Sequence, residues 1–310
     1  MTLRIGTRGS KLAMHQAGIL MEKLRIMSPG LDTKIVKIRT SGDAIPRDRA
    51  PKVQDKGMFV KEIDRALLDD QVDVAVHSMK DIPVERNEGI ALGAILERED
   101  PRDALITMDG CTLENIHSAA RVGTGSLRRR ALALHARPDL HIMDIRGNVD
   151  TRIDKVRTGE LDAVIVAQAG ILRLRPEGVR TGVIPENIIV PAAGQGAIGV
   201  EARAGDEETR SILEKVDHLP SRQEVTAERC LLEGVGGGCQ VPLGVRARMS
   251  STVLRLQVTV ASPDGKRRID LAGEGPPDDG SGTARKLARN LVSLGCLDIL
   301  NGIPQEHGGS

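Results

Sequence analysis

The sequence predicts an α/β protein with two similar α/β domains flanking a cleft, followed by a small C-terminal α+β domain. Three observations support this. Strand and helix signals alternate through the first two thirds of the chain. Residues 121–127 then repeat the pattern of residues 4–10, and residues 161–166 repeat that of residues 72–77. After Asp217 the pattern changes to short alternating strands between two helices.

The first elements follow from local signals. A β-like run at residues 3–7 is followed by Ser10, which is placed to cap a helix ending near Arg25. Residues 33–40 alternate lysine with isoleucine or valine, which indicates a half-buried strand. Residues 43–57 are polar and contain proline and glycine, which predicts a long loop. The next expected elements are a helix over 59–68, a strand over 72–77 and a hinge or crossover at 97–103.

The last third predicts a helix, a three-stranded antiparallel meander and a closing helix. The Pro-Asp-Gly sequence at residues 263–265 marks the turn between the last two strands. The expected ranges are 221–233 and 283–294 for the helices, and 241–248, 252–262 and 266–272 for the strands. The predicted domains are residues 1–96 plus 197–215, residues 97–196, and residues 216–310.

Composition narrows the class of protein. The 310 residues include 44 Lys and Arg against 43 Asp and Glu, which argues against a general nucleic-acid binder. Phe59 is the single aromatic residue, which excludes a base-stacking platform. The four cysteines are far apart, and neither a signal peptide nor a membrane span is visible. We therefore expect a reduced, cytoplasmic protein with neither a nucleic-acid partner nor membrane contact.

An acid and a cation lie together at the end of one predicted strand. Residues 77–83 read His-Ser-Met-Lys-Asp-Ile-Pro, so Lys80 and Asp81 share one turn at the carboxyl end of a strand. Sites in α/β proteins gather at such ends. The alternative is that Asp81 is a helix-capping residue in an ordinary loop.

Several arginines predict a site for an anionic ligand. Residues 121–180 hold 12 Lys and Arg against 7 Asp and Glu, and residues 123–126 precede a predicted helix N-terminus. Arginine suits bidentate pairing with carboxylate or phosphate. The alternative is a solvated basic face. The candidates are Arg8, Arg128, Arg129, Arg146, Arg152 and Arg173.

Cys239 follows three glycines, which leave room beside its sulfur and allow a lowered thiol pKa. Cys111, Cys230 and Cys296 have no such context and are expected to be structural. The sequence contains neither CxxC nor HxxxH, so we expect no metal. Its glycine motifs match neither nucleotide-binding fingerprint.

Taken together, these segments resemble the hydroxymethylbilane synthase (porphobilinogen deaminase) family over nearly the whole chain. The shared segments are residues 4–10, 56–62, 76–83, 97–103, 123–129, 146–148, 194–197 and 238–242. The resemblance implies two domains built like type II periplasmic binding proteins. It also implies condensation of four porphobilinogen units, with loss of ammonia, into hydroxymethylbilane. The primer would be a dipyrromethane cofactor held by Cys239 through a thioether.

The resemblance also assigns roles. Asp81 would act as acid, base and electrostatic partner of the ring, and Phe59 would stack on a pyrrole. Residues 43–57, with Lys52 and Lys56, would form a lid. The family suggests a monomer. The remaining residues implied at the site are Arg8, Arg146 and Arg152 for the incoming ring or elongation, Ser10, Lys80, Thr124, Ser126, Arg128, Arg129, Arg146 and Arg173 for the cofactor and chain, and Arg8, Ser10, Gln195 and Gly196 for the substrate.

Two positions depart from the family pattern. Gly236 stands where the family often has glutamate, and Gly125 stands where many members have serine, which removes one hydroxyl contact to the cofactor. Two other functions fit part of the sequence. A two-domain anion-binding protein would explain the repeat and the arginines, but not Cys239. A cysteine-dependent transferase or hydrolase would need a base near Cys239, and none is visible in the sequence.

Overall fold

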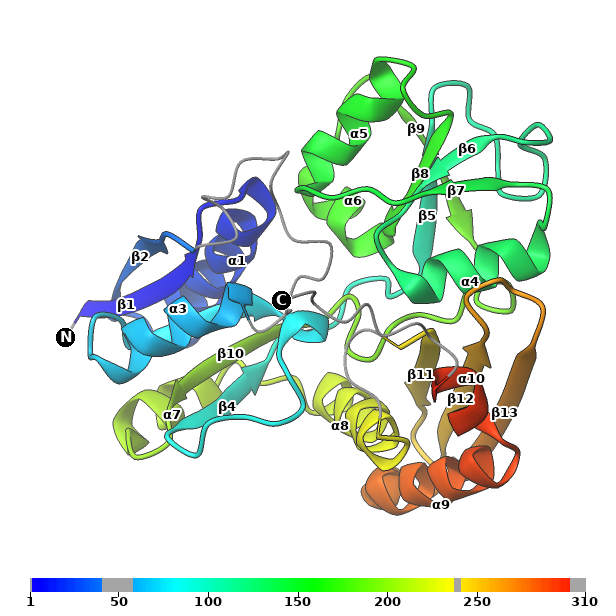
Figure 1. Cartoon of the computed structure of the whole chain (residues 1–310). Coiled ribbons are helices and arrows are strands. Elements are labelled where there is room, and N and C mark those ends of the chain that lie inside the picture. Colours follow the sequence, from blue (N-terminus) through cyan, green and yellow to red (C-terminus); the bar gives the residue numbers. More distant parts are fainter. Residues whose placement is uncertain (1, 41–57, 237–240, 302–310) are drawn as a thin grey trace, which may run out of the picture. The chain divides into compact units, whose positions relative to one another are not determined.

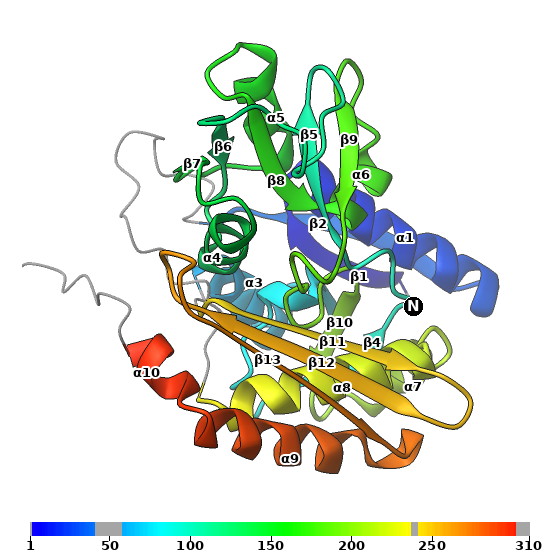
Figure 2. The same cartoon turned by 90° about the vertical axis from the view of Figure 1, so that its right-hand side faces the viewer.

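The computed structural model describes residues 2–40, 58–236 and 241–301. The chain forms two compact units (Figures 1 and 2). Unit 1 contains residues 1–99 and 196–222, and unit 2 contains residues 100–195 and 223–310. Neither unit is continuous in sequence, because the chain leaves unit 1 after its fourth strand and later returns to complete it.

Unit 1 is built on a mixed five-stranded sheet with the order β2-β1-β3-β10-β4. Strands β1 and β2 are parallel, as are β1 and β3, whereas β10 is antiparallel to both of its neighbours. The strands are β1 (Thr2–Arg8), β2 (Asp32–Ile38), β3 (Val74–Ser78), β4 (Ile90–Ile95) and β10 (Ile198–Arg203).

Helices cover both faces of this sheet. Leu20 and Leu24 of α1 (Lys11–Met27) pack on one face with Leu213 of α7 (Glu207–Glu214). Ile63 and Leu67 of α3 (Met58–Leu68) pack on the other face. All five side chains are fully buried, so an aliphatic core holds this unit together.

Unit 2 repeats this arrangement. Its five-stranded sheet has the order β7-β6-β8-β5-β9, with parallel pairs at β6–β7 and β6–β8 and an antiparallel β5 in the position of β10. Helix α4 covers one face, and α5 and α6 cover the other. The elements are β5 (Asp103–Thr107), β6 (Arg121–Gly123), α4 (Leu127–Ala136), β7 (His141–Met143), α5 (Val149–Arg157), β8 (Ala163–Ala167), α6 (Gln168–Leu174) and β9 (Arg180–Ile184).

The same unit contains a three-stranded antiparallel sheet, β11-β12-β13. Helix α9 packs on β12 and β13 (Figure 2). The elements are α8 (Leu219–Gly234), which begins in unit 1, β11 (Leu243–Met249), β12 (Leu254–Ala261), β13 (Arg268–Gly275), α9 (Gly280–Ser293) and α10 (Cys296–Asn301).

The structure confirms the α/β class, the internal repeat and the C-terminal meander. The matching strand orders of the two sheets give the sequence echo a structural basis. Ser10 caps α1 as expected, because its side chain accepts a hydrogen bond from the amide of Ala13. The predicted lid, residues 43–57, lies outside the described residues. Over the described ranges, none of the helices combines the length and apolar character needed to cross a bilayer.

Candidate functional site

In unit 1 the predicted site residues follow two neighbouring parallel strands. Arg8 ends β1, and Ser10 begins the turn into α1. Lys80 and Asp81 lie in a 3₁₀ turn, η1 (Met79–Asp81), directly after β3. Because β1 and β3 are parallel, their carboxyl ends meet at one edge of the sheet. The structure therefore brings these four residues to the same edge.

Backbone and side-chain hydrogen bonds fix the η1 turn. The amide of Met79 donates to the carbonyl of Ala197 at 3.0 Å, and the amide of Ile82 donates back to Met79 at 3.2 Å. Gln16 of α1 donates to the hydroxyl of Ser78 at 2.8 Å. Lys80 and Asp81 are half-buried. An acid and a cation are thus held on a short, anchored turn, as the strand-end pattern predicted.

In unit 2 the predicted residues follow three neighbouring strands in the same way. Residues 124–129 follow β6, residues 144–152 follow β7, and residues 168–173 follow β8. Since β6 is parallel to both β7 and β8, these segments share one edge of the sheet. The residues brought to this edge are Thr124, Ser126, Arg128, Arg129, Arg146 and Arg152, whereas Arg173 lies in the last turn of α6.

Arg128 and Arg129 are buried against a carboxylate that the sequence analysis did not single out. Asp103, at the start of β5, accepts from Arg128 Nη1 at 2.6 Å and from Arg129 Nε at 2.9 Å. Gln195 Nε2 donates to the same carboxylate at 2.9 Å. Asp103 is fully buried, and the two arginines are 4% and 5% exposed. The two guanidinium groups exceed the carboxylate by one positive charge.

The electrostatics of this cluster keep Asp103 charged. Burial on its own would raise the pKa of Asp103, but the two guanidinium groups outweigh it and hold that pKa far below its ordinary value. Asp103 therefore stays ionised and serves as the shared counter-ion of two arginines in a desolvated place. Ser126, which caps α4, adds a hydroxyl beside the cluster.

The second pair of arginines at this edge is held differently. Arg152 Nε donates to the carbonyl of Gly147 at 2.9 Å, and Arg146 Nε lies 3.9 Å from Asp144. Both arginines are half-buried. A shared loop positions them, whereas a shared buried carboxylate positions Arg128 and Arg129.

Steric crowding explains why glycine occupies position 125. A Cβ atom there would lie 2.5 Å from the carbonyl oxygen of Ile145. Serine would therefore require the segment after β7 to move. Gly125 therefore fits a place where the backbone after β6 passes close to the backbone at Ile145.

The remaining predicted residues divide into described and undescribed ones. Gln195 and Gly196 are buried, and Gln195 belongs to the Asp103 cluster. Phe59 is the second residue of α3, and its side chain lies outside the described part. Cys239 is also outside the described residues.

The three described cysteines are free thiols. Burial raises the pKa of Cys296, and a hydrogen bond to the carboxylate of Asp109 raises that of Cys111. Both shifts favour the unreactive thiol form, which agrees with structural roles for these two cysteines.

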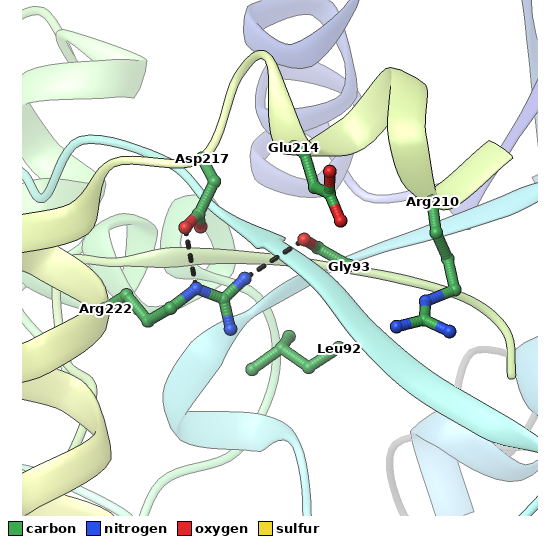
Figure 3. A pocket seen from close by; sticks show the side chains of 6 residues that line it. All are labelled: Leu92, Gly93, Arg210, Glu214, Asp217 and Arg222. Atoms are coloured by element: carbon green, nitrogen blue, oxygen red, sulfur yellow. Dashed lines mark hydrogen bonds and ion pairs between the residues drawn. The ribbon is translucent and has the colours of Figure 1, made fainter. Parts of the chain in front are cut away.

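A pocket of about 280 Å³ in unit 1 contains none of the predicted site residues (Figure 3). Arg222 at its wall donates to Asp217 at 2.7 Å and to the carbonyl of Gly93 at 3.0 Å. Its charges are balanced, because its lining includes two arginines and two carboxylates. The residues that line it are Leu92, Gly93, Arg210, Glu214, Asp217 and Arg222.

Comparisons with known proteins cover nearly the whole chain. Residues 3–211 match the family model "Porphobilinogen deaminase, dipyromethane cofactor binding domain", and residues 222–293 match "Porphobilinogen deaminase, C-terminal domain". The porphobilinogen deaminase of Pelotomaculum thermopropionicum is 43% identical over 98% of this chain and 97% of its own length. That of Geobacter sulfurreducens is 44% identical over 96% and 93%.

Solved structures that align with the chain are more distant. The BvgS VFT2 domain of Bordetella pertussis, as a double mutant, aligns with a TM-score of 0.42 and 16% identity, over 69% of this chain and 86% of that domain. A substrate-binding protein of an amino acid ABC transporter aligns with a TM-score of 0.39 and 14% identity, over 70% and 91%.

Proposed function

This chain belongs to the porphobilinogen deaminase family, and we propose that it converts porphobilinogen into hydroxymethylbilane on a dipyrromethane primer held by Cys239. The observation that carries the proposal is the match to both family domains, which together span residues 3–293 with a short gap. The enzyme is a transferase of tetrapyrrole biosynthesis. Four porphobilinogen molecules join head to tail, each losing ammonia, and water then releases the linear tetrapyrrole.

The primer, when bound, supplies the nucleophilic pyrrole carbon on which the chain grows. The residues of this chain suit the primer because their positive charges can pair with its carboxylates. Each pyrrole ring carries an acetate and a propionate, and the Arg128–Arg129–Asp103 cluster places two guanidinium groups around one carboxylate at the carboxyl edge of its sheet. We assign Arg128, Arg129 and Ser126 to the carboxylates of the primer.

Asp81 is assigned the proton transfers. Loss of ammonia requires a protonated amine and places positive charge on the ring. The Asp81 carboxyl group would give a proton to the departing amine; the carboxylate that remains would stabilise the positive ring and then accept the proton released when the new bond forms, which restores the carboxyl group. Lys80 on the same turn and Arg8 at the end of β1 would hold substrate or chain carboxylates, with Ser10 beside them.

The other assignments follow the family resemblance. Arg146, Arg152 and Arg173 would accept carboxylates of the elongating chain, Gln195 and Gly196 would contact the substrate, and Thr124 would contact the primer. Phe59 would stack on a pyrrole ring. We also propose a cytoplasmic monomer with three domains, the third starting at residue 216, since residues after that point form their own three-stranded sheet.

Mass spectrometry of the intact protein beside its Cys239→Ser variant tests the attachment. We expect the mass of two linked pyrrole units on the parent protein and its absence from the variant. If the parent protein is isolated without the primer, incubation with porphobilinogen should add it. A primer retained in Cys239→Ser would exclude this attachment site.

Asp81→Asn tests the chemistry separately. The variant should carry the primer and almost fail to turn over, because an amide can neither donate nor accept the required proton. Normal turnover with an intact primer would remove Asp81 from the proposed role.

A further inference from the structure

A buried charge cluster lies next to the η1 turn in unit 1. Arg86, in the loop after η1, donates to both oxygens of Glu201 at 2.8 and 2.7 Å and to both oxygens of Asp64 at 2.8 Å. Glu201 is on β10 and Asp64 is on α3. A single guanidinium group therefore joins three separate segments of the unit through two bidentate pairs, which is the strongest arrangement available to arginine.

The cluster is desolvated. The side chain of Glu201 is 1% exposed, and those of Arg86 and Asp64 are 16% and 18% exposed. Burial lowers the pKa of Arg86, but the two carboxylates outweigh it and raise that pKa above its ordinary value. Removing the cation would leave two carboxylates facing each other with little water to screen them.

His77 is the fourth residue of the cluster and lies beside Glu201. It lies on β3, and its Nε2 atom is 3.5 Å from Glu201 Oε2 and makes no hydrogen bond to any described residue. Asp64, His77 and Glu201 place three potential metal-ligand atoms within 4.8 Å of one another. Because Arg86 already pairs with both carboxylates, its guanidinium group supplies the positive charge that a metal ion would otherwise bring.

The η1 turn rests on the same part of the sheet. Gly199 of β10 is paired with His77 in the antiparallel register. A Cβ atom at Gly199 would lie 2.8 Å from Met79 Sδ and 2.7 Å from Ile82 Cδ1, so the glycine lets both ends of the turn pack onto β10. The turn is thus preceded by His77 and followed by Arg86, and both contact the carboxylate of Glu201.

We propose that Arg86 is a positioning residue for this reaction, clamping the η1 turn and helix α3 to strand β10 through Glu201 and Asp64. The clamp fixes the backbone that carries Asp81, and it fixes the helix whose second residue is Phe59. This inference rests on the proposed function, in which Asp81 performs the proton transfers. A displaced carboxylate should slow the chemical step more than substrate binding, since proton transfer depends steeply on geometry.

The charge state of His77 reports on the clamp independently of turnover. Burial is the largest influence on the pKa of His77 and lowers it; Arg86 and Arg8 act in the same direction and outweigh the opposing effect of Asp64 and Asp81, so the pKa is about 4. Glu201 faces the ring from β10 at 3.5 Å. With Arg86 removed, the ring would face these carboxylates with one cation fewer, so its pKa should rise.

The experiment compares Arg86→Gln with Arg222→Gln in the full-length holoenzyme. Arg222 is the matched control because it is a partly buried arginine of the same unit that pairs with a carboxylate, Asp217, away from the η1 turn. In Arg86→Gln, kcat should fall about 10- to 100-fold while KM for porphobilinogen changes less than about threefold. The control should keep the kcat of the parent protein.

Arg86→Lys and Asp64→Asn refine the test. Lysine keeps the charge but cannot form both bidentate pairs. The kcat of Arg86→Lys should therefore lie between those of the parent protein and Arg86→Gln, and its His77 ring should remain neutral near pH 6. If Arg86→Gln does not fold, Arg86→Lys carries the test alone. Asp64→Asn releases only the α3 side and should also give an intermediate kcat. An unchanged kcat in the folded Arg86 variants overturns the proposal.

Two readouts separate failure of this clamp from failure of the catalytic assignment. NMR titration of the histidine rings, with His77 assigned from a His77→Asn variant, should show a higher midpoint in Arg86→Gln. Hydrogen exchange at the amides of Met79 and Ile82 should become faster in the same variant. Should Asp81→Asn turn over normally, Asp81 loses its role, and these two readouts still decide the clamp. If neither changes, Arg86 does not hold the turn.

Discussion

Replacing Asp103 by asparagine should destabilise unit 2 strongly. The substitution keeps the size of the side chain and removes its charge, so two guanidinium groups that are 4% and 5% exposed lose their counter-ion. Breaking a buried ion pair by removing one partner costs about 3–5 kcal/mol. For a unit of this size, 1 kcal/mol corresponds to about 2–4 °C in Tm, so the expected loss is about 6–20 °C.

The assay is thermal unfolding followed by circular dichroism, with Asp278→Asn as the control. Asp278 is an exposed acid in the same unit, and its loss should change Tm by less than about 2 °C. Protein carrying the primer should lose less stability than primer-free protein, because primer carboxylates can replace the lost negative charge. A Tm of Asp103→Asn within 1 °C of the control would refute the view that Asp103 holds the two arginines.

Three further results are expected. His77 has a folded pKa of about 4, below the 6.5 of the unfolded chain, so its neutral form contributes stability that is complete above pH 6.5 and is lost as the pH falls to 4. Urea titrations should show a loss of about 3 kcal/mol over that window, absent from His77→Asn. Gly125→Ser should cost about 1–3 kcal/mol through the contact with Ile145, measured by denaturant unfolding, whereas Gly205→Ser, with open space around it, should cost little. Ser10→Ala should cost about 1 kcal/mol in the same assay, and an unchanged midpoint would contradict the observed cap.

The sequence was sufficient for elements whose signals are local. Ser10 before an amphipathic run placed the start of α1, and the Pro-Asp-Gly turn at 263–265 placed the last hairpin. The echo between residues 4–10 and 121–127 predicted two similar domains, because both copies place a strand, a turn and a helix N-terminus in the same order. The strand-end position of Asp81 was found in the same way.

Charged residues that act through distant partners could not be found in this way. Asp103 is the last residue of segment 97–103, in which six of seven residues are charged. The neighbouring sequence contains no signal that distinguishes Asp103 from Asp100. It is buried because β5 enters the sheet between β8 and β9 and meets two arginines from α4. Arg86 similarly lies in a polar stretch typical of a surface loop. Its partners are 22 and 115 residues away, so only the fold reveals the cluster.

The position of β10 has a consequence for synthesis on the ribosome. It pairs with β3 on one side and β4 on the other, yet it is made only after all five strands of the β7-β6-β8-β5-β9 sheet. Until it emerges, the first sheet lacks an inner strand, and both of its future neighbours keep unpaired backbone edges of the kind that recruit other chains. At ordinary elongation rates that interval spans about 100 residues, or roughly 5–20 s. After β4 has been made, the nascent chain must therefore avoid aggregation through these edges until β10 is made about 100 residues later.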